Sequence, residues 1–350
     1  MRIDIRCDGN REIASGHVRR CLALADAFDR QGAAVRLIVA DSESAALAEG
    51  CGWPIVVLQT DYRRPDGEIA LLIGELKQNR TDFLLIDSYF VSQSYLERLR
   101  GIVRTGYIDD LHAFSYPVDL LLQYACLGPL AEGVRGHAGK CLAGTMFAPL
   151  RNIFGSEDMR MPCRETVQRI LVTTGGADAR HMALRIAREF CDSKEPVFED
   201  VTFSLVVGSL SDDYQALKTL AGKDQRIEVL QNVEDMAALM KSSDLAITAA
   251  GTTLFELCAV GVPAAAFVFG PDQEGVMETL QGVVFDAGSA RDAAGAESSA
   301  HAALQWVATT GRLENAEKRR MLSERMRNVT DGKGAMRATV AMCEYIRNLK

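Results

Sequence analysis

Residues 244–269 read Asp-Leu-Ala-Ile-Thr-Ala-Ala-Gly-Thr-Thr-Leu-Phe-Glu-Leu-Cys-Ala-Val-Gly-Val-Pro-Ala-Ala-Ala-Phe-Val-Phe. This order predicts a strand, a turn of small residues, a short helix and a second strand. Thr252 or Thr253 is expected to cap the helix, and Gly261 with Pro263 is expected to end it. A helix that starts just after a parallel strand points unpaired N–H groups and the positive end of its dipole at the sheet edge, which favours a bound phosphate.

The same turn and helix are a candidate nucleotide site. Gly251 lets the backbone come close to a ligand, and Glu256, one turn into the helix, is placed to accept hydrogen bonds from two sugar hydroxyls. The alternative is a junction that binds nothing, because many α/β proteins place small residues there. The run resembles the donor-nucleotide motif of two-domain UDP-sugar enzymes of the GT-B type. This resemblance implies that Gly251, Thr252 and Thr253 hold the diphosphate of UDP, and that Glu256 holds its ribose.

Length and composition are typical of a globular protein of two domains. The chain has 350 residues, of which 48% are hydrophobic and 25% are charged. Its net charge of −8 argues against nucleic acid as a partner. No apolar run approaches the ~18 residues of a membrane span, and the N-terminus starts a strand instead of a signal peptide, so a cytoplasmic location is expected. The nine cysteines include no Cys-x-x-Cys pair and are typical of reduced, buried side chains.

Short apolar runs alternate with helix-like segments along the chain. This alternation predicts parallel strands joined by crossover helices, and therefore two doubly wound, Rossmann-like α/β domains. The GT-B resemblance implies that the domains face an interdomain cleft. We expect an N-terminal domain over 1–154, a linker over 155–165, a UDP-binding domain over 166–330 and a final helix over 331–350. The Ala/Gly/Ser-rich stretch 288–297 is expected to be a loop. Besides the strands of the opening stretch, the predicted strands cover 2–6, 35–39, 55–58, 83–87, 106–109, 120–122, 169–173, 202–207 and 226–230.

The first candidate catalytic residue follows the first strand. Ser15 and Gly16 mark a turn, and the apolar residues after them repeat with helical spacing, so His17 falls in the first turn of a helix. There the helix dipole disfavours an imidazolium and keeps the ring neutral, which is the form that a general base needs. The alternative is a histidine that only hydrogen-bonds its own loop.

Residues 6–25 read Arg-Cys-Asp-Gly-Asn-Arg-Glu-Ile-Ala-Ser-Gly-His-Val-Arg-Arg-Cys-Leu-Ala-Leu-Ala. This run resembles the N-terminal signature of the UDP-2,4-diacetamido-2,4,6-trideoxy-β-L-altropyranose hydrolase family of pseudaminic acid synthesis, which has relatives in spore-coat polysaccharide operons. The resemblance implies that His17 activates the water that attacks the sugar. It also implies that Asp8, Gly16 and Arg20, in the same signature, bind the substrate. The family's C-terminal helix packs back across both domains, which is expected here too.

Other positions in the first domain match the family or depart from it. Tyr89 ends a segment similar to the family's Asp-x-Tyr, which implies a contact to substrate; the alternative is a buried tyrosine that anchors the sheet edge. Asp109 and Asp110 are neighbours, so their side chains point to opposite faces and cannot share a proton. At least one of them is expected to cap the next loop. Ala14 replaces a usual Gly and predicts a stiffer loop, and Gln123 replaces a usual Asp or Asn, which affects the expected sugar contacts.

The second domain also has small or polar residues after its strands. Gly175 and Gly176 follow a predicted strand, where glycines permit a close approach to phosphate or sugar, although a tight turn also uses them. The loop at Val233 resembles the place where GT-B enzymes read the base. Gln273 stands second in a pair that is usually Asn-Gln in the family and is assigned to substrate binding. Asp272, the first of the pair, puts a carboxylate near an anionic diphosphate, which is unfavourable unless it is paired.

Together these motifs predict a hydrolase that cleaves the anomeric C–O bond of a UDP-sugar with inversion and releases UDP and a free sugar. An inverting glycosyltransferase needs the same donor site and base, a nucleotide-sugar-binding protein without activity would keep the fold, and a UDP-sugar 2-epimerase is a further alternative. No Asp-x-Asp occurs in the chain, so no metal site is predicted, and the helix N-terminus is expected to stabilise the leaving UDP instead. The sequence predicts no cofactor and sets neither the sugar nor the oligomeric state.

Overall fold

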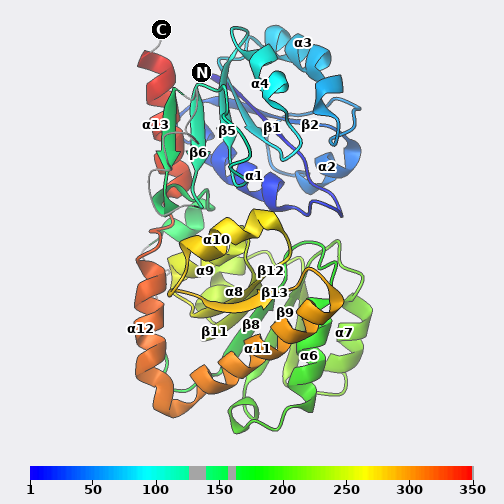
Figure 1. Ribbon diagram of the computed structural model, residues 1–350, viewed down its shortest axis with the longest axis vertical. Helices are drawn as coiled ribbons and strands as arrows, with labels where there is room; N and C mark the ends of the chain where they lie inside the picture. The colour runs from blue at the N-terminus through cyan, green and yellow to red at the C-terminus, as the bar shows by residue number, and fades with distance from the viewer. Residues whose placement is uncertain (126–138, 157–162, 349–350) are drawn as a thin grey trace. The chain divides into compact units, whose positions relative to one another are not determined.

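Figure 1 shows the computed structural model of the chain, which describes residues 1–125, 139–156 and 163–348. The chain divides into two compact units. Unit 1 combines Met1–Asn152 with Gly332–Lys350, and unit 2 is Ile153–Asp331. Most of the predicted linker falls on 157–162, which lie outside the described residues. Each unit has its own sheet of parallel strands with helices on both faces, which confirms the predicted pair of Rossmann-like α/β domains.

The sheet of unit 1 has seven parallel strands in the order β3-β2-β1-β4-β5-β6-β7. Six of these strands coincide with predicted apolar runs to within two residues at each end. The sequence does not predict the edge strand β7, which is short and carries a lysine and a cysteine among its four residues. The strands are β1 (Arg2–Cys7), β2 (Ala34–Val39), β3 (Ile55–Val57), β4 (Phe83–Asp87), β5 (Arg104–Ile108), β6 (Leu120–Gln123) and β7 (Lys140–Ala143).

Helices cover both faces of this sheet. One face packs against α3 and α4, where Leu72 and Leu96 join a buried core with Leu84 of β4. The other face packs against α1, and α13 from the end of the chain packs on α1 (Figure 1). Gln31, just beyond α1, donates from Nε2 to Thr339 Oγ1 of α13 at 2.5 Å. The helices are α1 (Gly16–Asp29), α2 (Ser42–Leu47), α3 (Ile69–Asn79), α4 (Gln93–Leu99) and α13 (Gly334–Asn348).

The sheet of unit 2 has six parallel strands in the order β10-β9-β8-β11-β12-β13. One face packs on α6, α7 and α11, where Phe190, Phe203 and Val307 belong to one buried core. On the other side of the sheet, α9 packs against α8 and α12. The strands are β8 (Arg169–Thr173), β9 (Thr202–Val207), β10 (Ile227–Gln231), β11 (Leu245–Ala249), β12 (Ala264–Val268) and β13 (Phe285–Ser289). The helices are α6 (Met182–Asp192), α7 (Tyr214–Ala221), α8 (Met236–Lys241), α9 (Thr252–Val260), α10 (Glu274–Thr279), α11 (Ala293–Gly311) and α12 (Ala316–Arg327).

The prediction of a loop over 288–297 is wrong. Its first two residues end β13, and its last five form the start of α11. Asp292 caps this helix, because its side chain accepts a hydrogen bond from the N–H of Gly295. Two of the alanines that suggested a loop are instead buried where β13 leads into α11, since Ala290 and Ala296 are 0% exposed.

Each sheet has one point where the chain order of the strands reverses. In unit 1 this switch point lies between β1 and β4, and in unit 2 it lies between β8 and β11. The helices that follow the two central strands leave on opposite faces of the sheet, so a crevice opens at the carboxyl ends of those strands, where ligands of such folds bind. Among the described residues, no helix combines the length and the apolarity needed to cross a bilayer.

The packing of α13 against the rest of unit 1 depends on a residue without a side chain. A Cβ added to Gly334 would lie 2.2 Å from the carbonyl oxygen of Ala148 and 2.6 Å from its nitrogen. We therefore expect Gly334→Ala to displace α13 and to destabilise unit 1 by roughly 1–3 kcal/mol. The midpoint of urea unfolding, followed by circular dichroism, measures this.

Gly74→Ala is the matched control. Gly74 is exposed within α3, and a Cβ there would meet no atom within 4 Å. Because alanine favours helix over glycine by about 1 kcal/mol, this control should raise the midpoint slightly. Equal midpoints for Gly334→Ala and the wild type would contradict the proposed packing of α13.

Candidate functional site

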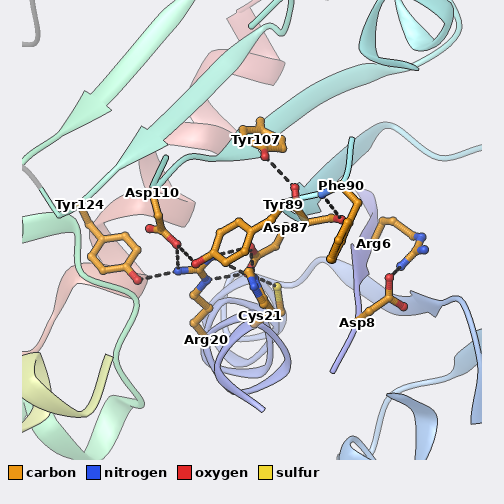
Figure 2. Close-up of polar contacts among 12 residues, drawn as sticks. Arg6, Asp8, Arg20, Cys21, Asp87, Tyr89, Phe90, Tyr107, Asp110 and Tyr124 are labelled. Carbon is orange, nitrogen blue, oxygen red and sulfur yellow. Dashed lines mark hydrogen bonds and ion pairs between the residues drawn. The ribbon is translucent and has the colours of Figure 1, made fainter. Parts of the chain in front are cut away.

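The carboxyl edge of the sheet in unit 1 gathers a buried cluster of polar side chains (Figure 2). His17 and Arg20 lie in the first two turns of α1, which follows β1. Asp87 is the last residue of β4, Asp110 lies just beyond β5, and Tyr124 comes directly after β6. Four neighbouring strands therefore deliver side chains to one place, at the switch point between β1 and β4 and beside it.

Asp87 is the centre of this cluster. His17 Nδ1 lies 2.6 Å from Asp87 Oδ1. Arg20 donates from Nη2 to the same oxygen and from Nε to Oδ2, both at 2.6 Å, and the Cys21 thiol also contacts Oδ2, at 3.4 Å. Burial by itself would raise the pKa of the Asp87 carboxyl. The charges and hydrogen bonds of Arg20 and His17 lower it by more, so the pKa lies below the ordinary value. Asp87 is therefore an ionised acceptor at neutral pH.

The contact to Asp87 determines how His17 can act. A neutral imidazole that donates from Nδ1 carries its acceptor lone pair on Nε2, so Nε2 is the atom able to take a proton. The buried carboxylate also stabilises the imidazolium that forms when Nε2 accepts that proton. The sequence predicts a neutral histidine from the helix dipole, and the structure adds an oriented partner that the sequence does not predict.

Tyr89 and Arg20 complete the surroundings of His17. The rings of Tyr89 and His17 meet edge to face, with centroids 4.3 Å apart. The Tyr89 hydroxyl donates to Asp110 Oδ2 at 2.8 Å, and Tyr89 is only partly buried. Arg20 Nη1 donates to the same Asp110 oxygen at 2.6 Å and to the Tyr124 hydroxyl at 2.7 Å. All three guanidinium nitrogens of Arg20 are thus bonded within the protein, which favours a role in holding the cluster together over the predicted direct contact to substrate.

Asp8 lies in a second buried network. Its Oδ1 accepts from the N–H of Ala40 at 2.7 Å, and its Oδ2 accepts from Arg6 Nη1 at 2.6 Å, the pair that Figure 2 shows beside the cluster. Arg6 donates its other two nitrogens to Glu68, at 2.7 and 2.8 Å. Glu68 is wholly buried and also accepts from the hydroxyl of Tyr95. Because both oxygens of Asp8 are bonded and its side chain is 2% exposed, this arrangement favours a structural role over the predicted contact to substrate.

Asp109 and Asp110 have separate environments, as their adjacent positions predict. Asp109 Oδ1 accepts from the N–H groups of Leu111 and His112, so this carboxylate does cap the loop after β5. Its Oδ2 accepts from Gln123 Nε2 at 2.8 Å. Gln123 itself is fully buried. The departure from the family at this position is therefore accommodated inside the protein.

The loop before α1 contains backbone in an uncommon conformation. Ala14 has φ of +56°, the left-handed region that glycine tolerates best. Its carbonyl oxygen accepts a hydrogen bond from the N–H of Asn10 at 3.2 Å, which closes the loop. The glycine usual in the resembling family is thus explained by the backbone. Gly16 begins α1, and a Cβ there would meet nothing within 4 Å.

The candidate nucleotide site lies at the switch point of unit 2. The structure contradicts the predicted threonine cap, because Gly251 is the N-cap residue of α9 and has no side chain to bond the first turn. The first N–H groups of a helix capped in this way need other partners, such as a ligand or water. Thr252 and Thr253 form the first turn, and Glu256, one turn in, is partly buried. The helix ends at Gly261, which has φ of +87°, as predicted.

Gly175 and Gly176 follow β8, the strand that pairs with β11. The glycine loop and the Gly251 turn thus leave neighbouring strands at the same edge of the sheet. Gly175 has φ of +89°, and a Cβ there would meet open space. Asp178 lies before the N-cap residue of α6, and its carboxylate accepts from the first two N–H groups of that helix. Burial raises the pKa of its carboxyl.

Two further predicted positions lie on loops at the carboxyl edge of unit 2. Val233 is partly buried between β10 and α8, at the edge of the sheet. Gln273 follows β12, and its Oε1 accepts from the N–H of Phe269 at 2.9 Å, which ties this side chain to its own loop. No cluster of three or more His, Cys, Asp or Glu with a geometry suited to a metal ion occurs among the residues that the structure describes.

The two Rossmann-like domains give the chain the glycosyltransferase-like GT-B fold. Residues 169–333 match the model of the glycosyltransferase family 28 C-terminal domain. The chain is 24% identical over 271 residues to the spore coat polysaccharide biosynthesis protein SpsG of Bacillus subtilis, a match that covers 75% of this chain and 76% of that protein.

Two more proteins extend the comparison. The UDP-2,4-diacetamido-2,4,6-trideoxy-beta-L-altropyranose hydrolase of Campylobacter jejuni is 23% identical over 261 residues, which cover 73% of this chain and 87% of that protein. The crystal structure of MurG from Acinetobacter baumannii superimposes with a TM-score of 0.65 at 14% identity, over 98% of this chain and 99% of that one. The likeness to MurG concerns the fold alone.

The buried network of Arg6 leads to a stability prediction. Arg6→Met would leave Glu68 and Asp8 as buried carboxylates without their cation, which is strongly destabilising, by roughly 3–5 kcal/mol. Arg104→Met is the control, because Arg104 is half exposed and its pair with Asp119 is expected to contribute less than about 1 kcal/mol. Urea unfolding of both variants measures the difference. Similar midpoints would show that the network adds little, and would reopen a binding role for Asp8.

Proposed function

We propose that this chain binds a UDP-sugar and hydrolyses its anomeric C–O bond, releasing UDP and a free sugar in the synthesis of a bacterial surface glycan or nonulosonic acid. The observation that carries this proposal is the pair of His17 and Asp87 at the switch point of unit 1, with Nδ1 and Oδ1 2.6 Å apart. An imidazole oriented by a buried carboxylate is suited to remove a proton from water. The similarity to the Campylobacter jejuni hydrolase supports water as the nucleophile.

In this proposal unit 2 binds the nucleotide part of the substrate. The match to the glycosyltransferase family 28 C-terminal domain spans the whole sheet of this unit and its helices as far as α12. We assign the diphosphate to the first N–H groups of α9, after Gly251, with Gly175 and Gly176 at the adjacent strand end. Glu256 is assigned to bind the ribose, and the loop at Val233 is assigned to bind the base.

The proposed reaction needs one proton transfer and one displacement. His17 Nε2 removes a proton from water while the water oxygen bonds to the anomeric carbon. The bond from that carbon to the diphosphate oxygen breaks, and UDP leaves with the electron pair. Attack from the face opposite the leaving group inverts the anomeric carbon. The positive end of the α9 dipole stabilises the charge that develops on UDP, and Asp87 stabilises the imidazolium.

A glycosyltransferase is the second candidate. In that reaction a sugar hydroxyl would replace water, and His17 would remove the proton from that hydroxyl instead. The specific observation in its favour is the match of residues 169–333 to a glycosyltransferase domain. A nucleotide-sugar-binding protein without activity is a third reading, although it gives no reason for the contact between His17 and Asp87.

The decisive experiment supplies UDP-sugars without any acceptor. The panel includes UDP-N-acetylglucosamine and the UDP-2,4-diacetamido-2,4,6-trideoxy sugar, and chromatography follows the release of UDP. We expect rapid release from one member, and a loss of about 10²-fold or more in His17→Ala, because a general base contributes that much. UDP affinity should be unchanged, since His17 belongs to unit 1.

His301→Ala is the control, because His301 is exposed on α11 and pairs with Glu189 of α6. It should keep the wild-type rate. A His17→Ala variant that retains more than about a tenth of the rate would contradict the assigned base. UDP binding without release from any sugar would favour the transferase or the inactive binding protein.

The nucleotide site is tested separately by titration calorimetry with UDP. Glu256→Gln keeps the size of the side chain but removes the charge that strengthens hydrogen bonds to the ribose, so UDP affinity should fall roughly tenfold. Glu297→Gln, on the exposed surface of α11, should leave affinity unchanged. Equal affinities of Glu256→Gln and the wild type would contradict the assigned ribose contact.

A further inference from the structure

One carboxylate oxygen in the cluster of unit 1, Asp110 Oδ1, is buried but accepts no hydrogen bond within the described part of the chain. The side chain of Asp110 is 5% exposed. Its Oδ2 accepts from Arg20 Nη1 and from the Tyr89 hydroxyl, and Figure 2 shows both dashed lines ending on this one oxygen. Its Oδ1 is buried and accepts no hydrogen bond from any residue that the structure describes.

Neighbouring carboxylates at this edge of the sheet differ from Asp110. Both oxygens of Asp87 are bonded, by Arg20 together with His17 and Cys21. Both oxygens of Asp8 and of Asp109 are bonded too. Leaving a buried oxygen of a charged group without a donor costs more than an ordinary hydrogen bond contributes, so such groups normally mark a missing partner.

We propose that Asp110 Oδ1 accepts a hydrogen bond from a donor group on the sugar of the substrate, and that Asp110 thereby helps to select that sugar. This inference rests on the proposed function, because it takes the ligand to be a UDP-sugar. The position supports it, since Tyr89 joins Asp110 to His17 through one hydrogen bond and one ring contact. A sugar whose anomeric carbon lies near His17 therefore has its substituents within reach of this side chain.

The donor belongs to one of two chemical kinds, a hydroxyl or the N–H of an acylamino group. Both donate well to a carboxylate. Because Oδ1 is buried, binding must shift a neighbouring side chain. Tyr89 is suited to this movement, since it is only partly buried and is held to Asp110 by its hydroxyl.

The test is a set of titrations of the full chain with UDP and with UDP-sugars. The gain in affinity of a UDP-sugar over UDP reports the contacts made by the sugar alone. Every protein titrated carries His17→Ala, so that the UDP-sugar is not hydrolysed during the measurement, and wild type here means that residue 110 is Asp. We expect Asp110→Asn to reduce this gain roughly tenfold or more, while affinity for UDP stays within about twofold. Asp119→Asn is the control, because Asp119 also accepts from an arginine and a backbone N–H but lies at the opposite edge of the sheet, before β6.

A second arm leaves the protein unchanged and alters the ligand. UDP-N-acetylglucosamine is compared with UDP-glucose, and with analogues in which fluorine replaces one hydroxyl and cannot donate. Removal of one donor group from the ligand should weaken wild-type binding about as much as Asp110→Asn does. The two losses of affinity should not add when that ligand is bound by Asp110→Asn. The position of that change identifies the donor as a hydroxyl or an acylamino N–H. This arm remains informative if Asp110→Asn fails to fold.

Two results would overturn the inference. The first is a gain in affinity from the sugar that is equal in the wild type and Asp110→Asn, which would mean that a buried water donates to Oδ1. The second is a wild type that binds every UDP-sugar no better than UDP, which would mean that no sugar donor reaches Oδ1. Failure of the proposed function is a different outcome. If the sugar raises affinity but the chain that keeps His17 releases no UDP, hydrolysis is refuted and the role of Asp110 stands.

Discussion

The buried ion pair between Arg20 and Asp87 is the interaction on which the candidate site of unit 1 depends. Two nitrogens of Arg20 bond both oxygens of Asp87 at 2.6 Å, and its third nitrogen reaches Asp110 and Tyr124. One planar cation thereby connects α1 with the ends of β4, β5 and β6. Such a pair contributes little net stability, because desolvation opposes the attraction, but it fixes geometry since removing either partner leaves a buried charge. The orientation of His17 follows from that fixed geometry.

Unit 2 builds its candidate site by other means. Its candidate residues include glycines at two neighbouring strand ends and the backbone N–H groups at the start of α9, where the helix dipole is positive. The two arrangements fit the two proposed tasks. Proton removal needs a side chain held at one angle, whereas a diphosphate is recognised by several weak donors that must come close together.

The sequence predicts much of the fold, because parallel strands buried on both faces produce continuous apolar runs. It fails at β7, whose four residues are too short and mixed for a pattern, and at the start of α11, where the capping signal is the single residue Asp292. Within the cluster of unit 1, the resemblance names His17, Arg20 and Tyr89, and the structure places these three side chains in contact with Asp87 or Asp110. The sequence does not predict the pairs Arg6–Glu68 and Arg20–Asp87, because their members are 62 and 67 residues apart and long-range pairings of charge leave no local pattern.

The docking of α13 on α1 also bears on how the chain is made. Unit 1 contains both the beginning and the end of the described chain, with all of unit 2 between them. During synthesis the sheet of unit 1 emerges first, yet the surface of α1 that receives α13 remains uncovered until the whole of unit 2 has been translated. The N-terminal unit must therefore remain soluble with an incomplete core, while the unit made later can finish folding before it.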